Sequence, residues 1–402
     1  MRIPGQRFFG GAGVIMVVAC VTAMLPLSID IYLPALPRLQ QEFSVSASVV
    51  NLTLILFFIG MAGSMLLWGP LSDKYGRKPI LTVGLLVFII ASLACAQAGS
   101  ILQLIVFRIV QSIGAGAGVA VNNAIIRDVF TGRERERALS AVITMILIAP
   151  VIAPTFGALL LQVMSWRGVF AVLSLLGCAA LGLTLLLSET IQRRQDRHVL
   201  STLARMGAVL KNIRFTFLLA LFSSPMLPAM AFVVSSSYIF IEYFALSEVQ
   251  YGLFYMVIAL FRLIGPYLYL LMTRTLQPRQ VISLGFAMAL LSGALLIGLG
   301  DQGPVWFTAA IIPIIPAGPM LRPPGVNLML EQQELEDAGS ASSLINAAPF
   351  FFGGAGMLLI SLVMERPILW LGLMCLAVGA VTTTLWGLSA RRDFIASVLD
   401  RR

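Results

Sequence analysis

Twelve long apolar runs, most of them 20 residues or more, divide this 402-residue chain. Hydrophobic residues make up 59% of the chain and charged residues 11%, against roughly 45–50% and 25% in an ordinary soluble domain. Hydrocarbon offers the main chain no hydrogen-bond partners, so apolar runs of about 20 residues favour helices that satisfy their own backbone. The alternating ten-residue strands of a membrane barrel are absent from the sequence. We therefore expect an all-α integral membrane protein.

The runs form two sets of six around one polar segment. The first set lies near residues 11–37, 46–68, 79–98, 101–126, 139–163 and 167–187. The second lies near 215–240, 251–272, 280–300, 304–326, 339–363 and 367–388. This predicts six-helix bundles at 1–188 and 215–390, a cytoplasmic linker at 189–214 and a cytoplasmic tail at 391–402. The first run is longer than the 7–15 residues of a secretory signal core, so we interpret it as a retained span.

Basic residues gather in alternate loops and in the polar segment between the two sets. The loops on one side carry Lys74, Arg77, Lys78, Arg133, Arg135, Arg137, Arg274, Arg279, Arg391 and Arg392. Because Lys and Arg are retained on the cytoplasmic side, this pattern predicts that both termini are cytoplasmic, in a bacterial inner membrane. The net charge of +9 is then a topology signal that also favours anionic lipid, and nucleic acid is not an expected partner.

The loop after the second run is the most specific motif, Gly69-Pro-Leu-Ser-Asp73-Lys-Tyr-Gly76-Arg77-Lys78-Pro79. Gly76 suits a tight reversal, and the charged residues can form ion pairs and bind helix ends. The segment resembles the loop between the second and third spans of the major facilitator superfamily, whose length and six-plus-six layout the chain also fits. The resemblance implies a cytoplasmic gate at Gly69, Asp73, Gly76, Arg77 and Lys78. The alternative is a plain positively charged turn.

The two halves resemble a diverged internal repeat, as expected for bundles that rock about a site at the membrane midplane. The loop after the eighth run reads Leu271-Met-Thr-Arg-Thr-Leu-Gln-Pro-Arg279. This second copy keeps basic charge and lacks the acid and the glycine. Gating chemistry is therefore expected mainly in the first half.

The fourth run carries Arg108-Ile-Val-Gln111-Ser112, which matches the superfamily pattern Arg-x-x-Gln-Gly except that Ser112 replaces the first glycine. An arginine within a span costs roughly 2.5–3.5 kcal/mol on insertion scales, so Arg108 is expected to face a polar cavity or a partner. The glycines that follow permit close helix packing.

The fifth run contains Ala149-Pro150-Val-Ile-Ala153-Pro154-Thr-Phe-Gly157. It resembles the Gly- and Pro-rich motif of the drug:proton antiporter branch, with alanine at some glycine positions. The resemblance implies a hinge and a seal against proton leak at Pro150, Pro154 and Gly157. A kinked helix with a structural role is the alternative.

The first run contains Ser28-Ile-Asp30-Ile-Tyr32-Leu-Pro34 and resembles the Bcr/CflA group of multidrug exporters, of the bicyclomycin and chloramphenicol type. Asp30 is the only one of the 18 acidic residues well inside an expected span. It lies about 10 Å from the outer end of its span, at the same depth as Arg108. We hypothesise that Arg108 keeps Asp30 ionised and that proton and substrate compete there. A fixed ion pair that only positions helices is the alternative.

Six further residues are candidate substrate contacts, because aromatic, Met and polar side chains suit varied apolar ligands. They are Tyr32, Met145, Met226, Tyr255, Arg262 and Asn346. Arg262 lies near the middle of the eighth run with no acid at matching depth in the second half; it either contacts an electronegative group or snorkels. Arg322, beside Pro323, lies nearer the cytoplasmic end, and no chemistry is assigned to it.

Together these features predict a proton-coupled antiporter that exports small, largely apolar neutral or zwitterionic compounds by alternating access. An exporter of an endogenous metabolite or siderophore, or a proton symporter, would use the same fold. The spans carry no catalytic or metal-binding constellation and the chain has no nucleotide-binding loop, so neither an enzyme nor an ATP-driven pump is expected. The expected partners are the substrate, protons and lipid. We expect a monomer that needs no cofactor besides the proton.

Overall fold

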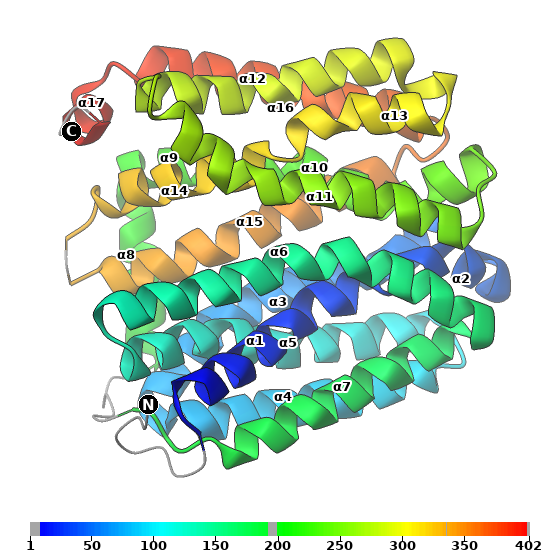
Figure 1. Ribbon diagram of the computed structural model, residues 1–402, viewed down its shortest axis with the longest axis horizontal. Helices are drawn as coiled ribbons and strands as arrows, with labels where there is room; N and C mark the ends of the chain where they lie inside the picture. The colour runs from blue at the N-terminus through cyan, green and yellow to red at the C-terminus, as the bar shows by residue number, and fades with distance from the viewer. Residues whose placement is uncertain (1–8, 192–198, 335, 400–402) are drawn as a thin grey trace. The chain divides into compact units, whose positions relative to one another are not determined.

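The computed structural model describes residues 9–191, 199–334 and 336–399, and the regular elements in these ranges are helices (Figure 1). Twelve helical segments among the described residues are long and apolar enough to cross a membrane. The expected all-α membrane architecture is thereby confirmed. The linker and tail expected at 189–214 and 391–402 lie partly outside the described residues, and the cytoplasmic position of the termini stays a prediction.

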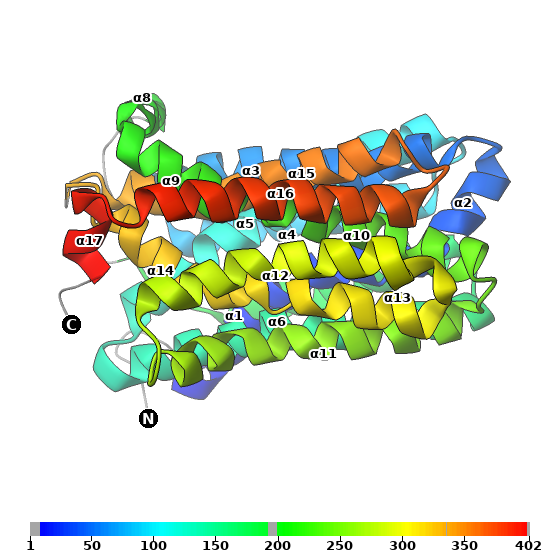
Figure 2. The same cartoon turned by 90° about the horizontal axis from the view of Figure 1, so that it is seen from above.

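Contacts divide the chain into two compact units, Met1–Thr202 and Leu203–Arg402. Each unit holds six of the twelve spans, and within each unit the spans run side by side along a common direction (Figures 1 and 2). The boundary between the units falls inside the helix α8 (Val199–Lys211), which lies within the range expected for the linker.

The first unit is built from eight helices, of which the first three form one span, Gly11–Phe43. They are α1 (Gly11–Asp30), the 3-10 helix η1 (Leu33–Ala35), α2 (Leu36–Phe43), α3 (Ala47–Tyr75), α4 (Arg77–Ala96), α5 (Ile101–Val129), α6 (Gly132–Val163) and α7 (Trp166–Leu186). α5 packs along both α3 and α4, and α1 packs along α6. This packing brings the motifs of the first, fourth and fifth spans together.

The second unit is built in the same order, with interrupted first and fourth spans. Its helices are α9 (Ile213–Ser223), α10 (Met226–Ser237), the π-helical segment η2 (Tyr238–Tyr243), α11 (Glu248–Met272), α12 (Pro278–Leu299), η3 (Gly300–Gln302), α13 (Pro304–Ile311), η4 (Ile312–Ile314), α14 (Ala317–Leu330), α15 (Ala338–Ser361), α16 (Pro367–Ser389) and α17 (Asp393–Leu399). α10 packs along α15, and α12 packs along α16.

Prolines interrupt the first span of each unit. In the first unit α1 ends at Asp30 and η1 follows; Pro34 has no N–H, so it cannot donate to the carbonyl four residues earlier. In the second unit α9 ends at Ser223 and α10 begins after Pro225. The sequence did not predict these breaks. A broken helix leaves main-chain groups available at membrane depth, where transporters place their binding sites.

Three helix ends reach beyond the expected spans. The first span ends at Phe43 where residue 37 was expected, α3 ends at Tyr75 where residue 68 was expected, and α6 begins at Gly132 where residue 139 was expected. Each extension carries charged residues. Hydropathy marks the part of a helix that lies in hydrocarbon, so it does not report turns that continue into the headgroup region.

Candidate functional site

Asp30 lies directly before the break in the first span. It is the last residue of α1, and its side chain is buried, with 6% exposed. The last carbonyls of a helix lack intrahelical donors and carry partial negative charge. An acid at this position lies away from water and beside that negative helix end, so its ionised form needs compensation from nearby positive charge.

Arg108 of α5 supplies positive charge at the same break and is fully buried. Its Nη1 donates hydrogen bonds to the Ser28 carbonyl at 3.1 Å and to Gln111 Oε1 at 2.7 Å. Ser28 precedes Asp30 by two residues, so the guanidinium compensates the carbonyl end of α1. Among the described residues, Nε and Nη2 of Arg108 have no hydrogen-bond partner. Two donors of a buried cation are thus open to another acceptor.

Three aromatic rings surround the Arg108 guanidinium. Its Cζ lies 4.2 Å from the centre of the Phe57 ring, 5.1 Å from that of Tyr32 and 5.7 Å from that of Phe170. Ring faces attract a cation without accepting a directed hydrogen bond, so they hold Arg108 in place and leave its free donors unoccupied. The Tyr32 hydroxyl lies 3.2 Å from Thr53 Oγ1. Tyr32 is fully buried here, and its contact with substrate stays a prediction.

A chain of hydrogen bonds fixes the side of the guanidinium that faces Gln111. Gln111 Nε2 donates to Ser92 Oγ at 2.7 Å, and the Ser92 hydroxyl donates to the Phe88 carbonyl at 2.7 Å. All three groups lie inside the α4–α5 packing. The sequence identified Gln111 only as part of a motif and did not identify Ser92, because their pairing depends on how two helices meet.

The structure thus places Arg108 at the break that begins after Asp30, in keeping with the equal depth expected from the sequence. Its described bonds go to the main chain of Ser28 and to Gln111. A direct ion pair between the guanidinium and the Asp30 carboxylate stays a prediction, as does competition between proton and substrate for that acid.

The loop motif after α3 forms a charged cluster at one end of the first unit. Arg77 Nη1 lies 2.6 Å from Asp73 Oδ1 and donates to Ser72 Oγ at 2.6 Å, while Arg77 Nε donates to Asp128 Oδ2 at 3.0 Å. The Ser72 hydroxyl in turn donates to the Gly69 carbonyl at 2.8 Å. Arg77 therefore ties the ends of α3 and α5 together from the start of α4. Asp128 was not predicted; no local pattern links it to a loop 51 residues earlier.

Glu189, three residues after the end of α7 at Leu186, completes the cluster. It accepts hydrogen bonds from the backbone N–H groups of Arg77 at 2.9 Å and Lys78 at 3.3 Å. A carboxylate at a helix N-terminus satisfies otherwise unpaired donors and complements the helix dipole. Gly76 has φ of +109°, and a Cβ there would lie within 2.4 Å of Glu189 Oε2. Only glycine fits both the conformation and the close approach. Lys78 Nζ donates to the Leu185 carbonyl at 2.7 Å.

The Gly- and Pro-rich motif of α6 packs directly on the break in the first span. A Cβ on Gly157 would lie 2.1 Å from the Ile31 carbonyl oxygen. Pro150 and Pro154 are buried inside α6, which continues without interruption from Gly132 to Val163. The main-chain break therefore lies in the first span, opposite the motif. Whether α6 acts as a hinge or a seal stays a prediction.

An apolar hollow of about 350 Å³ lies between α1 and α6. It is lined by Ala12, Ile15, Met16, Ala19, Cys20, Ala23, Ala141 and Met145. Met145, one of the predicted substrate contacts, is 43% exposed there. Thioether and alanine surfaces of this kind adapt to apolar ligands of varied shape.

The remaining predicted substrate contacts lie in the second unit. Tyr255 is 4% exposed and stacks on Phe232, with ring centres 5.9 Å apart, so it belongs to an aromatic core. Met226 is half-buried at the start of α10. Asn346 of α15 accepts a hydrogen bond from Arg322 Nη2 at 2.9 Å, and Arg262 is half-buried on α11. Their contacts with substrate stay predictions.

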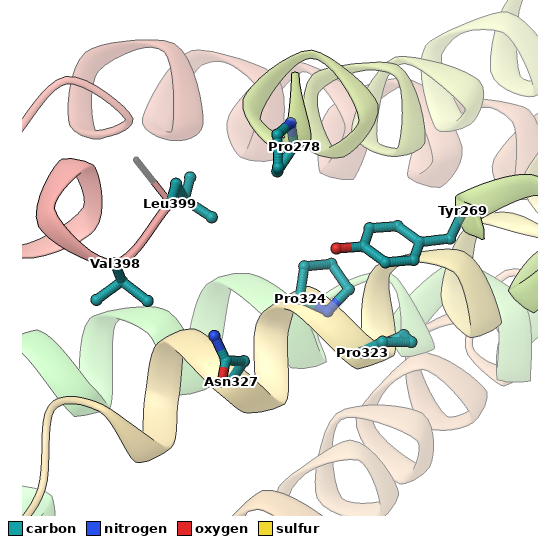
Figure 3. Close-up of a pocket in the computed structure, with 7 residues that line it drawn as sticks. All are labelled: Tyr269, Pro278, Pro323, Pro324, Asn327, Val398 and Leu399. Atoms are coloured by element: carbon teal, nitrogen blue, oxygen red, sulfur yellow. The ribbon is translucent and has the colours of Figure 1, made fainter. Parts of the chain in front are cut away.

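A second cavity, of about 260 Å³, lies in the second unit beside the C-terminal helix α17. Figure 3 shows Val398 and Leu399 on one side of it and Tyr269, Pro324 and Asn327 facing them. Pro278 and Pro323 complete the lining. It contains none of the predicted site residues.

Comparison with known proteins supports the architecture. The chain matches the family model of the Major Facilitator Superfamily over residues 18–357. It is 27% identical over 359 residues to the bicyclomycin resistance protein homolog of Haemophilus influenzae, covering 87% of this chain and 89% of that protein. It is 37% identical over 154 residues to the multidrug resistance protein MdtL of Klebsiella pneumoniae, covering 38% and 39%.

A solved peptide transporter of the POT type superposes with a TM-score of 0.77 at 12% identity, over 99% of this chain and 98% of that one. At this identity the likeness shows the fold alone. The family match covers most of the chain and includes the spans that carry Asp30, Arg108 and Arg77. The chain belongs to the Major Facilitator Superfamily, and it is a membrane transporter and not an enzyme.

Proposed function

We propose that this transporter exports small, largely apolar neutral or zwitterionic compounds in exchange for protons. The observation that carries the proposal is the buried Arg108 guanidinium, which has two unoccupied donors beside the helix break at Asp30. A buried cation with free donors favours a nearby ionised acid or an electronegative ligand. Protonation of Asp30 removes one of the two possible occupants, so proton and substrate can alternate.

The direction of transport is inferred from relatives and from the driving force. Two relatives are named for resistance to bicyclomycin or to multiple drugs, which is the result expected of export. A proton moving down a potential of 100 mV releases about 2.3 kcal/mol per charge. That free energy supports more than about tenfold accumulation of a neutral compound. No cofactor other than the proton is needed.

The charged cluster around Arg77 supplies the gate in this proposal. It joins the ends of α3, α4 and α5 and the residues that follow α7, all within one unit. Arg77 is buried while Asp73 and Asp128 are partly exposed, so opening these ion pairs costs free energy that water or new partners offset in the open state. The basic loops support a cytoplasmic position of this end in a bacterial inner membrane, and we expect a monomer.

Susceptibility profiling tests the substrate class. Cells that express the wild type or Asp30→Asn would be challenged with chloramphenicol-like, bicyclomycin-like and lipophilic cationic compounds. We expect the wild type to protect against the first two classes and Asp30→Asn to give no protection at matched expression. Strong protection against dications would contradict the proposal.

Proton release separates antiport from the alternatives. Addition of a substrate to purified protein in weak buffer should release protons if substrate and proton compete. A proton symporter would take up protons instead. An exporter of an endogenous metabolite or siderophore would release protons with that compound and give little antibiotic resistance.

A further inference from the structure

Two arginines of the second unit, Arg262 and Arg322, lie at least eight residues inside their spans, and the proton exchange described above uses neither. Arg322 lies on α14 within the span Pro304–Leu330, and its side chain is accessible to solvent although the surrounding protein desolvates it. Arg262 lies on α11 and is half-buried. A guanidinium that faces lipid is costly, so an exposed arginine within a span is expected to face a polar path or an anionic group.

The arginines and Asn346 lie at one depth. Arg322 is eight residues before the end of α14 at Leu330, and Asn346 is eight residues after the start of α15 at Ala338. Arg262 is ten residues before the end of α11 at Met272. These three helix ends lie at the same end of the unit. At 1.5 Å per residue, the side chains are about 12–15 Å inside the bundle.

Hydrogen bonds orient the most exposed of these groups. Arg322 Nη2 donates to Asn346 Oδ1 at 2.9 Å, and Asn346 Nδ2 donates to the Ser342 carbonyl at 2.9 Å. The Asn346 amide is thus oriented by one bond at its oxygen and one at its nitrogen, and it occupies the Nη2 side of the Arg322 guanidinium. The remaining donors of Arg322 are left for another acceptor.

Arg262 contributes a second positive charge near Arg322. Within the described part of the chain neither arginine forms an ion pair with a carboxylate. Two cations that repel each other at membrane depth would both gain from one shared anion. A planar guanidinium fork matches the two oxygens of a carboxylate better than it matches a single acceptor.

We propose that Arg322, positioned by Asn346 and assisted by Arg262, binds the carboxylate group of transported compounds. This inference rests on the proposed function and narrows it, because it selects zwitterionic or acid-bearing compounds over wholly neutral ones. A lipid phosphate would offer the same charge. The arginines, however, lie about 12–15 Å from the helix ends, which is deeper than the headgroup layers of a bilayer whose total thickness is about 40–45 Å.

The test compares two probes that differ in one group. A fluorescent naphthyl carboxylate and its primary amide would be titrated against purified protein in phosphatidylcholine nanodiscs, with fluorescence anisotropy as the readout. The wild type should bind the carboxylate more tightly. Arg322→Gln should weaken carboxylate binding about ten- to a hundredfold and amide binding less than about threefold. Arg262→Gln should weaken carboxylate binding about three- to tenfold.

Two further variants separate recognition from general charge. Arg322→Lys keeps the charge and loses the fork, so it should recover only part of the carboxylate affinity. Arg274→Gln removes an exposed basic residue in the loop after α11 and should change neither affinity. Equal loss of both probes in Arg322→Gln, or a wild type that binds both equally, would overturn the inference.

Lipid is tested in the same system. If phosphatidylglycerol added to the nanodiscs displaces the carboxylate probe from the wild type, the site belongs to a lipid phosphate and the inference is wrong. Binding is measured without a proton gradient, so it does not depend on coupling. Selective carboxylate binding by a protein that fails to exchange protons would overturn the proposed function and support this inference.

Discussion

Gly157 of α6 lies against the Ile31 carbonyl in the first unit, and Gly356 of α15 lies against the Leu227 carbonyl in the second. In both places an added Cβ would be 2.1 Å from the carbonyl oxygen. In both units the fifth span therefore packs on the main chain of a broken first span. The two units therefore share this packing of the fifth span on the first, here called the shared frame, as expected of the internal repeat.

The chemistry placed on that frame differs between the units. The first unit holds Arg108 with its aromatic rings and the ion pairs of Arg77. In the second unit, the helix after the equivalent loop, α12, begins with a neutral contact in which Gln280 Oε1 accepts from the Gln277 N–H at 2.9 Å. We infer that proton coupling and gating belong to the first unit and recognition of charged substrate groups to the second.

Arg108→Ala should produce the largest effect. It removes two charge-assisted hydrogen bonds and the buried cation, so proton-driven export should fall by about a hundredfold or more. Arg322→Gln, in the other unit, should leave export of a neutral compound within about threefold of the wild type. Transport of a radiolabelled neutral compound into inverted vesicles measures both. If both variants lose the same fraction of transport activity, the two units do not have the separate roles inferred above.

Arg77→Gln should come next. It leaves Asp73 and Asp128 facing each other without their shared cation, and we expect about a tenfold loss of transport rate. The matched control is Arg274→Gln in the equivalent loop of the second unit, where the described residues show no ion pair to break. If Arg274→Gln is as damaging as Arg77→Gln, gating is shared by both units.

Gly157→Ala and Gly356→Ala test the shared frame. Each methyl would meet a carbonyl oxygen at 2.1 Å, so each should lower the free energy of unfolding by about 1–3 kcal/mol. Gly298→Ala, at a helical position with no atom within 4 Å, should be neutral or stabilising. Thermal unfolding in detergent measures all three. A penalty at only one of the two packed glycines would show that the frames differ.

Glu189→Gln should have the smallest effect. Glutamine has one acceptor oxygen, so it can keep the bond from the Arg77 N–H but loses the bond from the Lys78 N–H together with the charge at the start of α4, at about 1 kcal/mol in all. Glu136→Gln, at an exposed position on α6, is the control for removing an acid. A change in melting temperature larger than that of Arg77→Gln would mean that Glu189 holds the cluster together.

The sequence predicted the twelve spans because hydrocarbon selects long apolar runs, and the family motifs led to Asp30, Arg108 and the Arg77 loop. It did not predict the break after Asp30. Proline also occurs inside α6, which stays continuous, so proline alone does not decide between a break and a tolerated residue.

Several site residues could be found only from the fold. Ser92, Asp128 and Glu189 are ordinary polar residues whose partners lie 19, 51 and 112 positions away along the chain. Arg322 was assigned no chemistry because it lies nearer the cytoplasmic end, and its hydrogen bond to Asn346, 24 residues away, is visible only in the fold. The side-chain contacts of the predicted substrate residues depend on a bound compound, and for this reason they stay predictions.

Uphill transport in proteoliposomes tests the central claim most directly. With a pH gradient imposed across the membrane, the wild type should concentrate a chloramphenicol-like compound against its own gradient, and Asp301→Asn, which changes an exposed acid at η3, should do the same. Asp30→Asn should only equilibrate the compound, at a rate that does not depend on pH. Concentration of the compound by Asp30→Asn with the pH dependence of the wild type would contradict the account.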